Sequence, residues 1–296
     1  MRFLTILLAG ICCVQISWAQ KTGHVNYSNL GIEFDLPPGW TGQEGDGMLV
    51  VGNPSVTGGI LMMVHAYSLQ ELIRETRNGI SEGEGNNLQL ASEVARLGDH
   101  AIECQLSGVL NWQPAYAHMI SMENPHGMGI TILGISDQGN FDPNFFQQLC
   151  RTIYQSVRFK KPVKSQQSKE WETALANARL TYMDSYYSGG YGEGAVGGGY
   201  STRITIDLCG GKYFKYRMND QVSAGGASST AMNSSQGRGQ GTWEVMDNAA
   251  GGSVLVLSFH NGEVLMHDIG YQNDELYLSG ERYYLTRGGE YAADCP

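Results

Sequence analysis

Eight short segments of alternating apolar and polar residues constrain the fold more than any other feature of the sequence. They cover residues 179–187, 201–208, 212–217, 242–246, 254–259, 264–269, 275–278 and 281–286. Tight turns join several of them, among them Asn261-Gly262, a pair that is typical of β-hairpins. No helical period separates the segments. The pattern therefore predicts an all-β domain that folds as an eight-stranded up-and-down barrel.

Two connections of this predicted barrel are long, residues 188–200 and 218–241. Successive connections of an up-and-down barrel fall at alternate ends, so we expect both long loops at one rim, where they form the mouth. The first contains Gly192, Gly194 and Gly197 in the spacing of a dinucleotide-binding fingerprint. That fingerprint needs a helix after the glycines, whereas a strand pattern follows here. We therefore interpret the segment as a loop at the rim.

Aromatic and cationic side chains at this mouth are the candidate ligand-binding residues. Tyr187, Tyr191 and Tyr200 border the glycine-rich loop, and tyrosine joins a flat apolar ring to a hydroxyl that holds sugars, peptides or amphipathic ligands. Arg238 is the only charged residue of 223–241 and would anchor an anionic group. His260, beside the predicted hairpin turn, completes the set. The alternative is that the tyrosines only cover a half-buried sheet, for which their β propensity is high.

Polar residues crowd into positions 161–170, which we interpret as a linker between a domain at 20–160 and the barrel domain at 171–296. The chain has 296 residues, a length that is typical of two domains. In the first domain, Ser68 and Glu71 form a capping-box pattern, and Asp142 and Pro143 mark the start of a second amphipathic helix. Strand-like segments fill the region between them. The first domain is therefore expected to be α+β, an antiparallel sheet with packed helices.

Two resemblances follow from these segments. A strand that ends in "LPPGW" and a closing helix that runs into "SVRF" resemble the PsbP family and its bacterial relatives such as DcrB. The resemblance implies an exported accessory protein and no catalytic residues. The second half of the chain resembles a lipocalin-like barrel in Trp171 and in the segments "LCGGKYFKY", "GTWEV" and "LYLSGERYY". It lacks the G-x-W motif of lipocalins. An eight-stranded barrel either holds one small ligand or is filled by its own side chains.

The first 19 residues have the composition of a signal peptide. Arg2 precedes the apolar run "FLTILLAGICCV", and Ser17 and Ala19 are the small residues expected before a cleavage site. A lipoprotein signal that ends at Cys12 is the alternative. No other stretch reaches 18 apolar residues, so we expect a mature chain without a transmembrane segment. The predicted location is periplasmic or extracellular.

Removal of the signal peptide leaves an even set of cysteines, Cys104, Cys150, Cys209 and Cys295. An oxidising compartment favours disulfides in such a set. The domain boundary separates the first two from the last two, so we expect the pairs Cys104–Cys150 and Cys209–Cys295. The barrel topology also places the last cysteine at the rim that holds Cys209. Metal ligation is the alternative, but no pair has C-x-x-C spacing.

Other titratable residues form no recognised catalytic or metal motif in the sequence. We expect His65, His100 and His118 to be satisfied residues of the sheet, and His267 to lie opposite Val256. The carboxylates are expected on solvated, outward faces of strands, namely Glu33, Asp35, Glu103 and Asp207.

A net charge of −10 argues against nucleic-acid binding, which needs clustered lysine and arginine side chains. We therefore expect an exported, non-enzymatic binding protein without a cofactor, which engages a small molecule, a glycan or an envelope protein at the barrel mouth. An accessory module that acts through the first domain is the second hypothesis. A hydrolase with an unrecognised site is the third.

Overall fold

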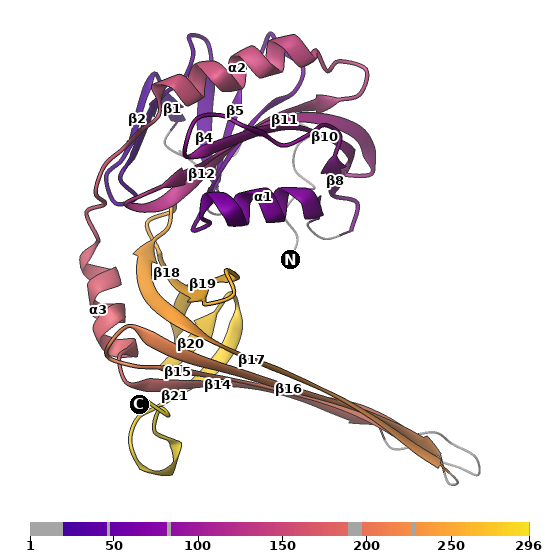
Figure 1. Ribbon diagram of the computed structural model, residues 1–296, viewed down its shortest axis with the longest axis vertical. Coiled ribbons are helices and arrows are strands. Elements are labelled where there is room, and N and C mark those ends of the chain that lie inside the picture. Colours follow the sequence, from indigo (N-terminus) through magenta and orange to yellow (C-terminus); the bar gives the residue numbers. More distant parts are fainter. Residues whose placement is uncertain (1–19, 46–47, 82–83, 189–196, 227–228, 296) are drawn as a thin grey trace. The chain divides into compact units, whose positions relative to one another are not determined.

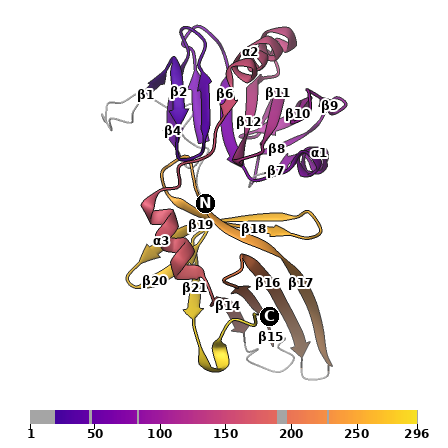
Figure 2. The ribbon, with the colours of Figure 1, turned by 60° about the vertical axis from the view of Figure 1, so that its left-hand side comes forward.

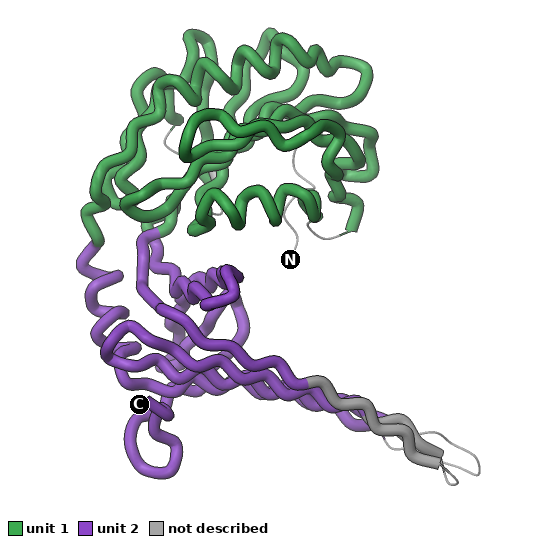
Figure 3. Tube along the Cα trace, viewed as in Figure 1, with its two compact units in different colours: residues 1–164, 248–251 green, residues 165–247, 252–296 purple. Residues whose placement is uncertain are grey.

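The structure is a computed structural model that describes residues 20–45, 48–81, 84–188, 197–226 and 229–295. The predicted signal peptide, residues 1–19, lies outside the described residues. The chain divides into two compact units, residues 1–164 with 248–251 and residues 165–247 with 252–296 (Figure 3). Across the described residues, no helix is long and apolar enough to cross a membrane.

The first unit is largely β-sheet. Its main sheet has ten strands in the order β1-β4-β5-β6-β12-β11-β10-β8-β7, with β9 paired to β10 (Figure 1). These strands are β1 (Gln20–Thr22), β4 (Thr41–Gly45), β5 (Met48–Gly52), β6 (Gly59–His65), β7 (Ile80–Ser81), β8 (Asn87–Leu90), β9 (Ala95–Arg96), β10 (Ala101–Leu110), β11 (Gln113–Asn124) and β12 (Gly127–Asp137). A smaller sheet contains β2 (His24–Tyr27), β3 (Ile32–Asp35) and β13 (Arg158–Phe159).

Two helices pack on this unit, and both begin where the sequence predicts. Helix α1 (Leu69–Asn78) has the capping box of Ser68 and Glu71, and α2 (Pro143–Ser156) begins after the N-cap Asp142. Each cap satisfies backbone N–H groups that the first turn of a helix leaves without partners. The expected α+β domain is therefore shown only in part, because sheet predominates over these two helices.

The predicted Cys104–Cys150 disulfide is wrong, and the sheet explains why. Both thiols are free and buried. Cys104 packs beside Leu72 of α1, whereas its neighbour Glu103 on β10 is bonded to Arg151 of α2. Successive strand residues point to opposite faces, so the two helices cover opposite faces of the sheet. Cys104 and Cys150 are consequently separated by the sheet itself.

The second unit is a closed antiparallel barrel whose eight strands pair in sequence order, which confirms the predicted topology. The strands are β14 (Ala178–Ser188), β15 (Gly197–Leu208), β16 (Tyr213–Gly226), β17 (Ser229–Asp247), β18 (Ser253–Phe259), β19 (Val264–Gln272), β20 (Glu275–Leu278) and β21 (Glu281–Thr286). β21 pairs with β14 over residues 179–181 and closes the barrel. A short 3₁₀ helix, Gly289–Tyr291, follows the last strand.

Side chains fill the barrel along its axis. Leu180, Ile206, Phe214 and Leu255 are among the core residues, and each is fully buried. The sequence left open whether the barrel holds a small ligand or is filled by its own side chains. Its own side chains fill it.

Residues that were expected to be a linker instead form a helix at the base of the barrel, the end where β14 begins. Helix α3 (Gln166–Leu175) packs its buried Leu175 into the barrel core. The hydroxyl of its Ser168 donates to the Asp247 carboxylate over 2.6 Å, and Ser165, the N-cap, donates to the same carboxylate. The second half of the expected linker, from residue 166 onward, is therefore part of helix α3. The two units divide between residues 164 and 165.

One hairpin differs from the predicted register. Between β18 and β19 the N–H of Phe259 donates to the carbonyl of Glu263, which leaves a three-residue turn with Gly262 at a φ of 84°. His267 consequently pairs with Leu255 and not with Val256. The shift of one residue points His267 into the barrel, because side chains alternate between the two faces of a strand.

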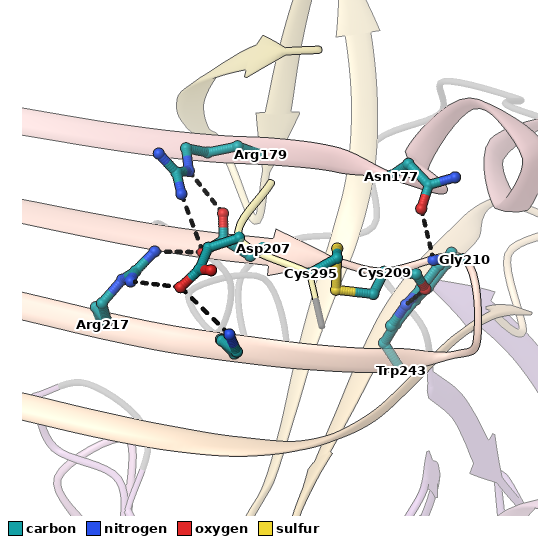
Figure 4. Close-up of a disulfide and its surroundings, with 10 residues drawn as sticks. Asn177, Arg179, Asp207, Cys209, Gly210, Arg217, Trp243 and Cys295 are labelled. Atoms are coloured by element: carbon teal, nitrogen blue, oxygen red, sulfur yellow. Dashed lines mark hydrogen bonds and ion pairs between the residues drawn. A yellow bond between two sulfur atoms is a disulfide. The ribbon is translucent and has the colours of Figure 1, made fainter. Parts of the chain in front are cut away.

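The predicted Cys209–Cys295 disulfide is present, with a Cα–Cα distance of 5.6 Å. It ties the end of the chain to the base of the barrel (Figure 4). The Trp243 indole N–H donates to the carbonyl of Cys209 over 2.9 Å, and the carboxylate of Asp294 pairs with Lys215 and Arg217. The C-terminal segment is therefore held covalently and by ion pairs.

Replacement of Cys295 by serine should lower the free energy of unfolding of the second unit by about 4 kcal/mol, because the bond closes a long loop in the unfolded chain. Urea denaturation of the second unit measures the change, with Cys150→Ser as the control in the first unit.

The same pairing predicts that alkylation of the unreduced, denatured chain 20–296 labels Cys104 and Cys150 alone. Labelling of Cys209 in that experiment would contradict it.

Candidate functional site

Four strands of the barrel continue beyond the point where the barrel closes. β14 loses its partner β21 after Thr181, and β17 loses β18 beyond Gly241. β14, β15, β16 and β17 nevertheless stay paired with one another as far as the pair Gly226 and Ser229. We call this four-stranded projection, residues 182–188, 197–204, 218–226 and 229–239, the arm (Figures 1 and 2). Its β16 segment spans about 30 Å at roughly 3.3 Å per residue.

The predicted mouth of two long loops is wrong, because most of these residues are strands of the arm. Residues 218–241 were expected to be a loop, but they are strand except at 227 and 228, which lie outside the described residues. Of the other expected loop, Gly197 to Tyr200 belong to β15, and 189–196 lie outside the described residues. Gly and Ser have low β propensity, so the segment alone gives no strand signal. Backbone pairing of β16 with β15 nevertheless extends the sheet through these residues. The two segments do emerge at the same end of the barrel, as predicted.

One face of the arm, the inner face, continues the face that forms the barrel core. Tyr186 on β14, Tyr200 on β15 and Val222 on β16 lie in one cross-strand row. Tyr186 is six residues from the core residue Leu180, so the row shares its face. Outside the barrel these side chains are exposed. Tyr186 is 59%, Tyr200 43% and Val222 54% exposed.

The two tyrosines of this row form a pair of rings. The ring centroids of Tyr186 and Tyr200 are 6.2 Å apart and the rings are inclined by 28°. The Tyr200 hydroxyl donates to the carboxylate of Asp184 over 3.0 Å, and this hydrogen bond raises the pKa of Tyr200. Asp184 lies in the next row on the same face, in register with Asp220 of β16. The inner face thus combines flat aromatic rings with carboxylates.

We call the opposite face of the arm, together with the barrel wall that it continues, the outer face. This face carries cationic side chains. Arg217 on β16 and Arg238 on β17 are direct cross-strand partners, and Arg203 on β15 is diagonal to Arg217. Arg203 and Arg238 are exposed. Within the arm, Asp184 and Asp220 therefore lie on the inner face, whereas Arg203 and Arg238 lie on the outer face.

The predicted site residues do not meet at a single mouth. Tyr200 lies on the inner face, whereas Tyr187, which is 77% exposed, and Arg238 lie on the outer face. Tyr191 lies outside the described residues. The exposed His260 follows β18 on the barrel wall, where its N–H donates to Gln240.

His260 lies far from the tyrosine pair, as the position of its partner Gln240 on β17 shows. Asn233 continues the row of Tyr200, and Gln240 lies seven residues farther on, about 23 Å at roughly 3.3 Å per residue. Tyr186 and Asp184, which complete the inner-face group, were absent from the predicted set. The period-two spacing of Tyr182, Asp184 and Tyr186 places all three on one face and is the signal that could have identified them.

Three clusters of polar residues are buried, and the two at Glu103 and Asp207 correct the sequence predictions. His65, in the other cluster, is a satisfied residue of the sheet, as predicted. Glu103, expected to be solvated, is 7% exposed and accepts hydrogen bonds from Arg151 at 2.8 and 2.6 Å and from His118 at 2.8 Å. Burial alone would raise the pKa of Glu103, but these hydrogen bonds outweigh it and the pKa is lowered. Burial lowers the pKa of His118 despite the nearby carboxylate. The Nδ1 atom of His118 is buried without a hydrogen-bond partner, so this residue is only partly satisfied.

His65 and Ser121 form a second buried cluster with the composition of a nucleophile and its base. His65 Nε2 lies 3.2 Å from the Ser121 hydroxyl, which in turn is 2.6 Å from the hydroxyl of Thr131. Ser121 is 1% exposed, and the third member is a hydroxyl where a triad needs a carboxylate. Burial lowers the pKa of His65 to about 4. We interpret this cluster as internal packing of the sheet.

Asp207 is the centre of the third cluster, on the barrel wall (Figure 4). It was expected to be solvated but is fully buried. Its carboxylate accepts hydrogen bonds from Arg179 at 2.6 and 3.3 Å and also pairs with Arg217. Arg217 pairs with Asp294 as well, so this cluster connects three strands with the C-terminal segment.

Neither metal ligands nor a deep apolar cavity marks a site in the described parts of the chain. No group of three His, Cys, Asp or Glu side chains there could hold a metal ion. A hollow of about 390 Å³ on the first unit lies beside His100, Tyr154 and Arg158. We find no nucleophile and base positioned together along its walls.

Two solved structures are distantly similar to this chain. No family model and no curated protein matches the chain. A solved structure from Bacteroides thetaiotaomicron VPI-5482 is 11% identical with a TM-score of 0.34, covering 52% of this chain and 59% of that chain. A protein of unknown function of the DUF3598 family from Nostoc punctiforme PCC 73102 is 14% identical with a TM-score of 0.16, covering 88% and 83%. The chain thus spans less than two thirds of the first of these proteins.

Replacement of Asp207 by asparagine should destabilise the second unit by about 3 kcal/mol, because it leaves two guanidinium groups without their buried counter-ion. We expect the lower end of the usual range, since both arginines keep contact with water. Glu290→Gln, an exposed carboxylate near the same terminus, should change stability by less than about 0.5 kcal/mol. Urea denaturation compares the two, and equal effects would contradict a structural role for Asp207.

The buried imidazole of His65 predicts a loss of stability in acid. Its pKa is about 4 in the folded chain against 6.5 when unfolded, so only the unfolded chain takes up the proton between these values. The stabilisation is complete above pH 6.5 and falls by up to about 3 kcal/mol as the pH approaches 4. Hydrogen exchange of β11 and β12 should show this slope. His65→Gln should flatten it, whereas the exposed His24→Gln should not.

Proposed function

We propose that the protein is an exported, non-catalytic binding protein that captures its partner on the inner face of the arm. The observation that carries the proposal is the exposed pair of rings that Tyr186 and Tyr200 form on the inner face of the arm. Contiguous exposed apolar groups mark interaction sites, and aromatic residues are enriched at interfaces. Holding two rings on paired strands also reduces the conformational entropy that this surface loses on binding.

The charges of the inner face favour a cationic polypeptide segment as the partner. Asp184 borders the rings, Asp220 lies in its row, and the arginines of this region lie on the other face. A lysine or arginine side chain gains from contact with the face of a tyrosine ring, by about 0.5–1 kcal/mol at exposed sites. A neighbouring carboxylate strengthens that attraction. An anionic ligand gains neither contribution here.

The filled barrel supports surface binding over enclosure of a ligand. Core residues of the barrel are buried against one another, and α3 packs at its base. A ligand of the size that lipocalin-type barrels enclose would have to displace this core. The function assigned to the lipocalin-like domain is therefore to hold the arm in a fixed register.

Export is supported by two separate features. The first 19 residues have the pattern of a signal peptide, and the disulfide between Cys209 and Cys295 is of the kind that persists in oxidising compartments. We therefore place the protein in the periplasm or outside the cell. The sheet of the first unit, with a helix on each face, supports a role like that of the PsbP-type accessory domains that its sequence resembles.

The double replacement Tyr186→Ser, Tyr200→Ser should weaken binding of a random lysine–tyrosine copolypeptide by about tenfold, because two cation–π contacts are lost. Biolayer interferometry with the immobilised chain 20–296 measures the change. The control Tyr291→Ser removes an equally exposed tyrosine far along the chain from the arm. A glutamate–tyrosine copolypeptide tests the charge preference. Equal binding of both copolypeptides, or binding that the double variant leaves unchanged, would refute the proposal.

A further inference from the structure

The strand β14 has a free edge along the arm. Its pairing with β21 ends at Thr181, and in the described residues no other strand pairs with that side of residues 182–188. The hydroxyl of Thr286 on β21 lies 3.4 Å from the carbonyl oxygen of Arg179, so the backbone groups of Arg179 face the β21 side. Backbone groups of alternate strand residues face the same side. Met183, Ser185 and Tyr187 therefore present their N–H and C=O groups along the free edge.

This edge lacks the usual protection against pairing. Natural sheets block free edges with lysine, proline, bulges or very short strands. The segment "YMDSYYS" contains neither lysine nor proline, and the register of β14 with β15 runs without a shift over all of it. Asp184 is its only charged residue. Unpaired, long and regular edges are templates for another strand.

We propose that this edge pairs with the same edge of a second copy of the chain, antiparallel, with Ser185 at the two-fold axis. This register uses all of the free residues 182–188 of both copies. It places Met183 opposite Tyr187 of the second copy, a favourable sulfur–aromatic pair, twice by symmetry. It also places each Asp184 opposite a tyrosine, Tyr186.

The neighbouring symmetric registers are less favourable. An axis at Asp184 would set two carboxylates directly opposite each other, where like charges destabilise a sheet. An axis at Tyr186 or Tyr187 would shorten the paired segment within residues 182–188. The axis at Ser185 lets residues 183, 185 and 187 each exchange a pair of backbone hydrogen bonds with the second copy. The edge is thus complementary to itself in one register.

Pairing of this kind joins two arms into one eight-stranded sheet. Residues that are opposite in an antiparallel pair share a face, so the inner faces of the two arms become continuous. The pairs of Tyr186 and Tyr200 from both copies would then lie on one surface. The proposal goes beyond partner binding, which a single arm supports alone, and its failure would leave the proposed function intact.

Cysteine cross-linking tests the register directly. Ser185→Cys should give a disulfide-linked dimer under mild oxidation of the chain 20–296, because the two copies of residue 185 would lie about 5.5 Å apart between their Cα atoms. The control is Ser201→Cys, which is equally exposed and lies directly opposite Ser185 on β15. Three strand spacings, about 14 Å, would separate its two copies, beyond the reach of a disulfide. Equal cross-linking of both variants, or none of Ser185→Cys, would overturn the proposal.

Sedimentation velocity of the unlinked chain gives the second measurement. We expect a dimer whose dissociation constant rises more than tenfold in Ser185→Pro, which removes an edge N–H and leaves the bonds to β15 in place, and stays unchanged in Ser185→Ala. A monomer at all concentrations would overturn the proposal. Open-ended assemblies would overturn it as well, since they would mean that β14 pairs with the β17 edge of the next copy.

Discussion

Unbroken backbone pairing from β14 to β17 is the constraint on which the rest of the structure depends. Inside the barrel, burial of Leu180 and Ile206 fixes which residues face the core. Because side chains alternate strictly, that choice also determines the faces of residues six or more positions away in the arm. The hydrophobic core therefore sets the orientation of side chains such as Tyr186 and Tyr200 that it does not contact. A filled barrel is well suited to this role, since a packed core holds the strands more rigidly than a ligand cavity would.

Much of the fold could be predicted because its signals are local. The N-cap Asp142 and the capping box at Ser68 mark helix starts through contacts within one turn, and alternation marks the barrel strands. Residues 218–241 could not be predicted in this way, since their strand conformation comes from partners on β15 and not from their own composition. The pairing of Cys104 with Cys150 failed for a related reason. Sequence order placed them in one domain but could not show that the sheet lies between them.

The candidate site was predicted only in fragments. Tyr200, Tyr187 and Arg238 were identified as exposed residues of the same region, yet the arm divides them between its two faces. Glu103 and Asp207 show the same limit for charges. Each was expected in water, because its partners lie far away along the chain, Arg151 for the first and Arg179 for the second. Register and counter-ions are properties of the paired sheet, so they become visible only when the strands are placed together.

The alternation that joins barrel and arm restricts how this region can change during evolution. Insertion of one residue into β15 between the core and Tyr200 would turn Tyr200 to the opposite face of the sheet, away from Tyr186 and Asp184, without altering any residue type. Insertions of two residues would preserve the faces and only lengthen the reach. Homologous chains should therefore tolerate arms of different length while the number of residues between the barrel wall and the tyrosine pair keeps its parity.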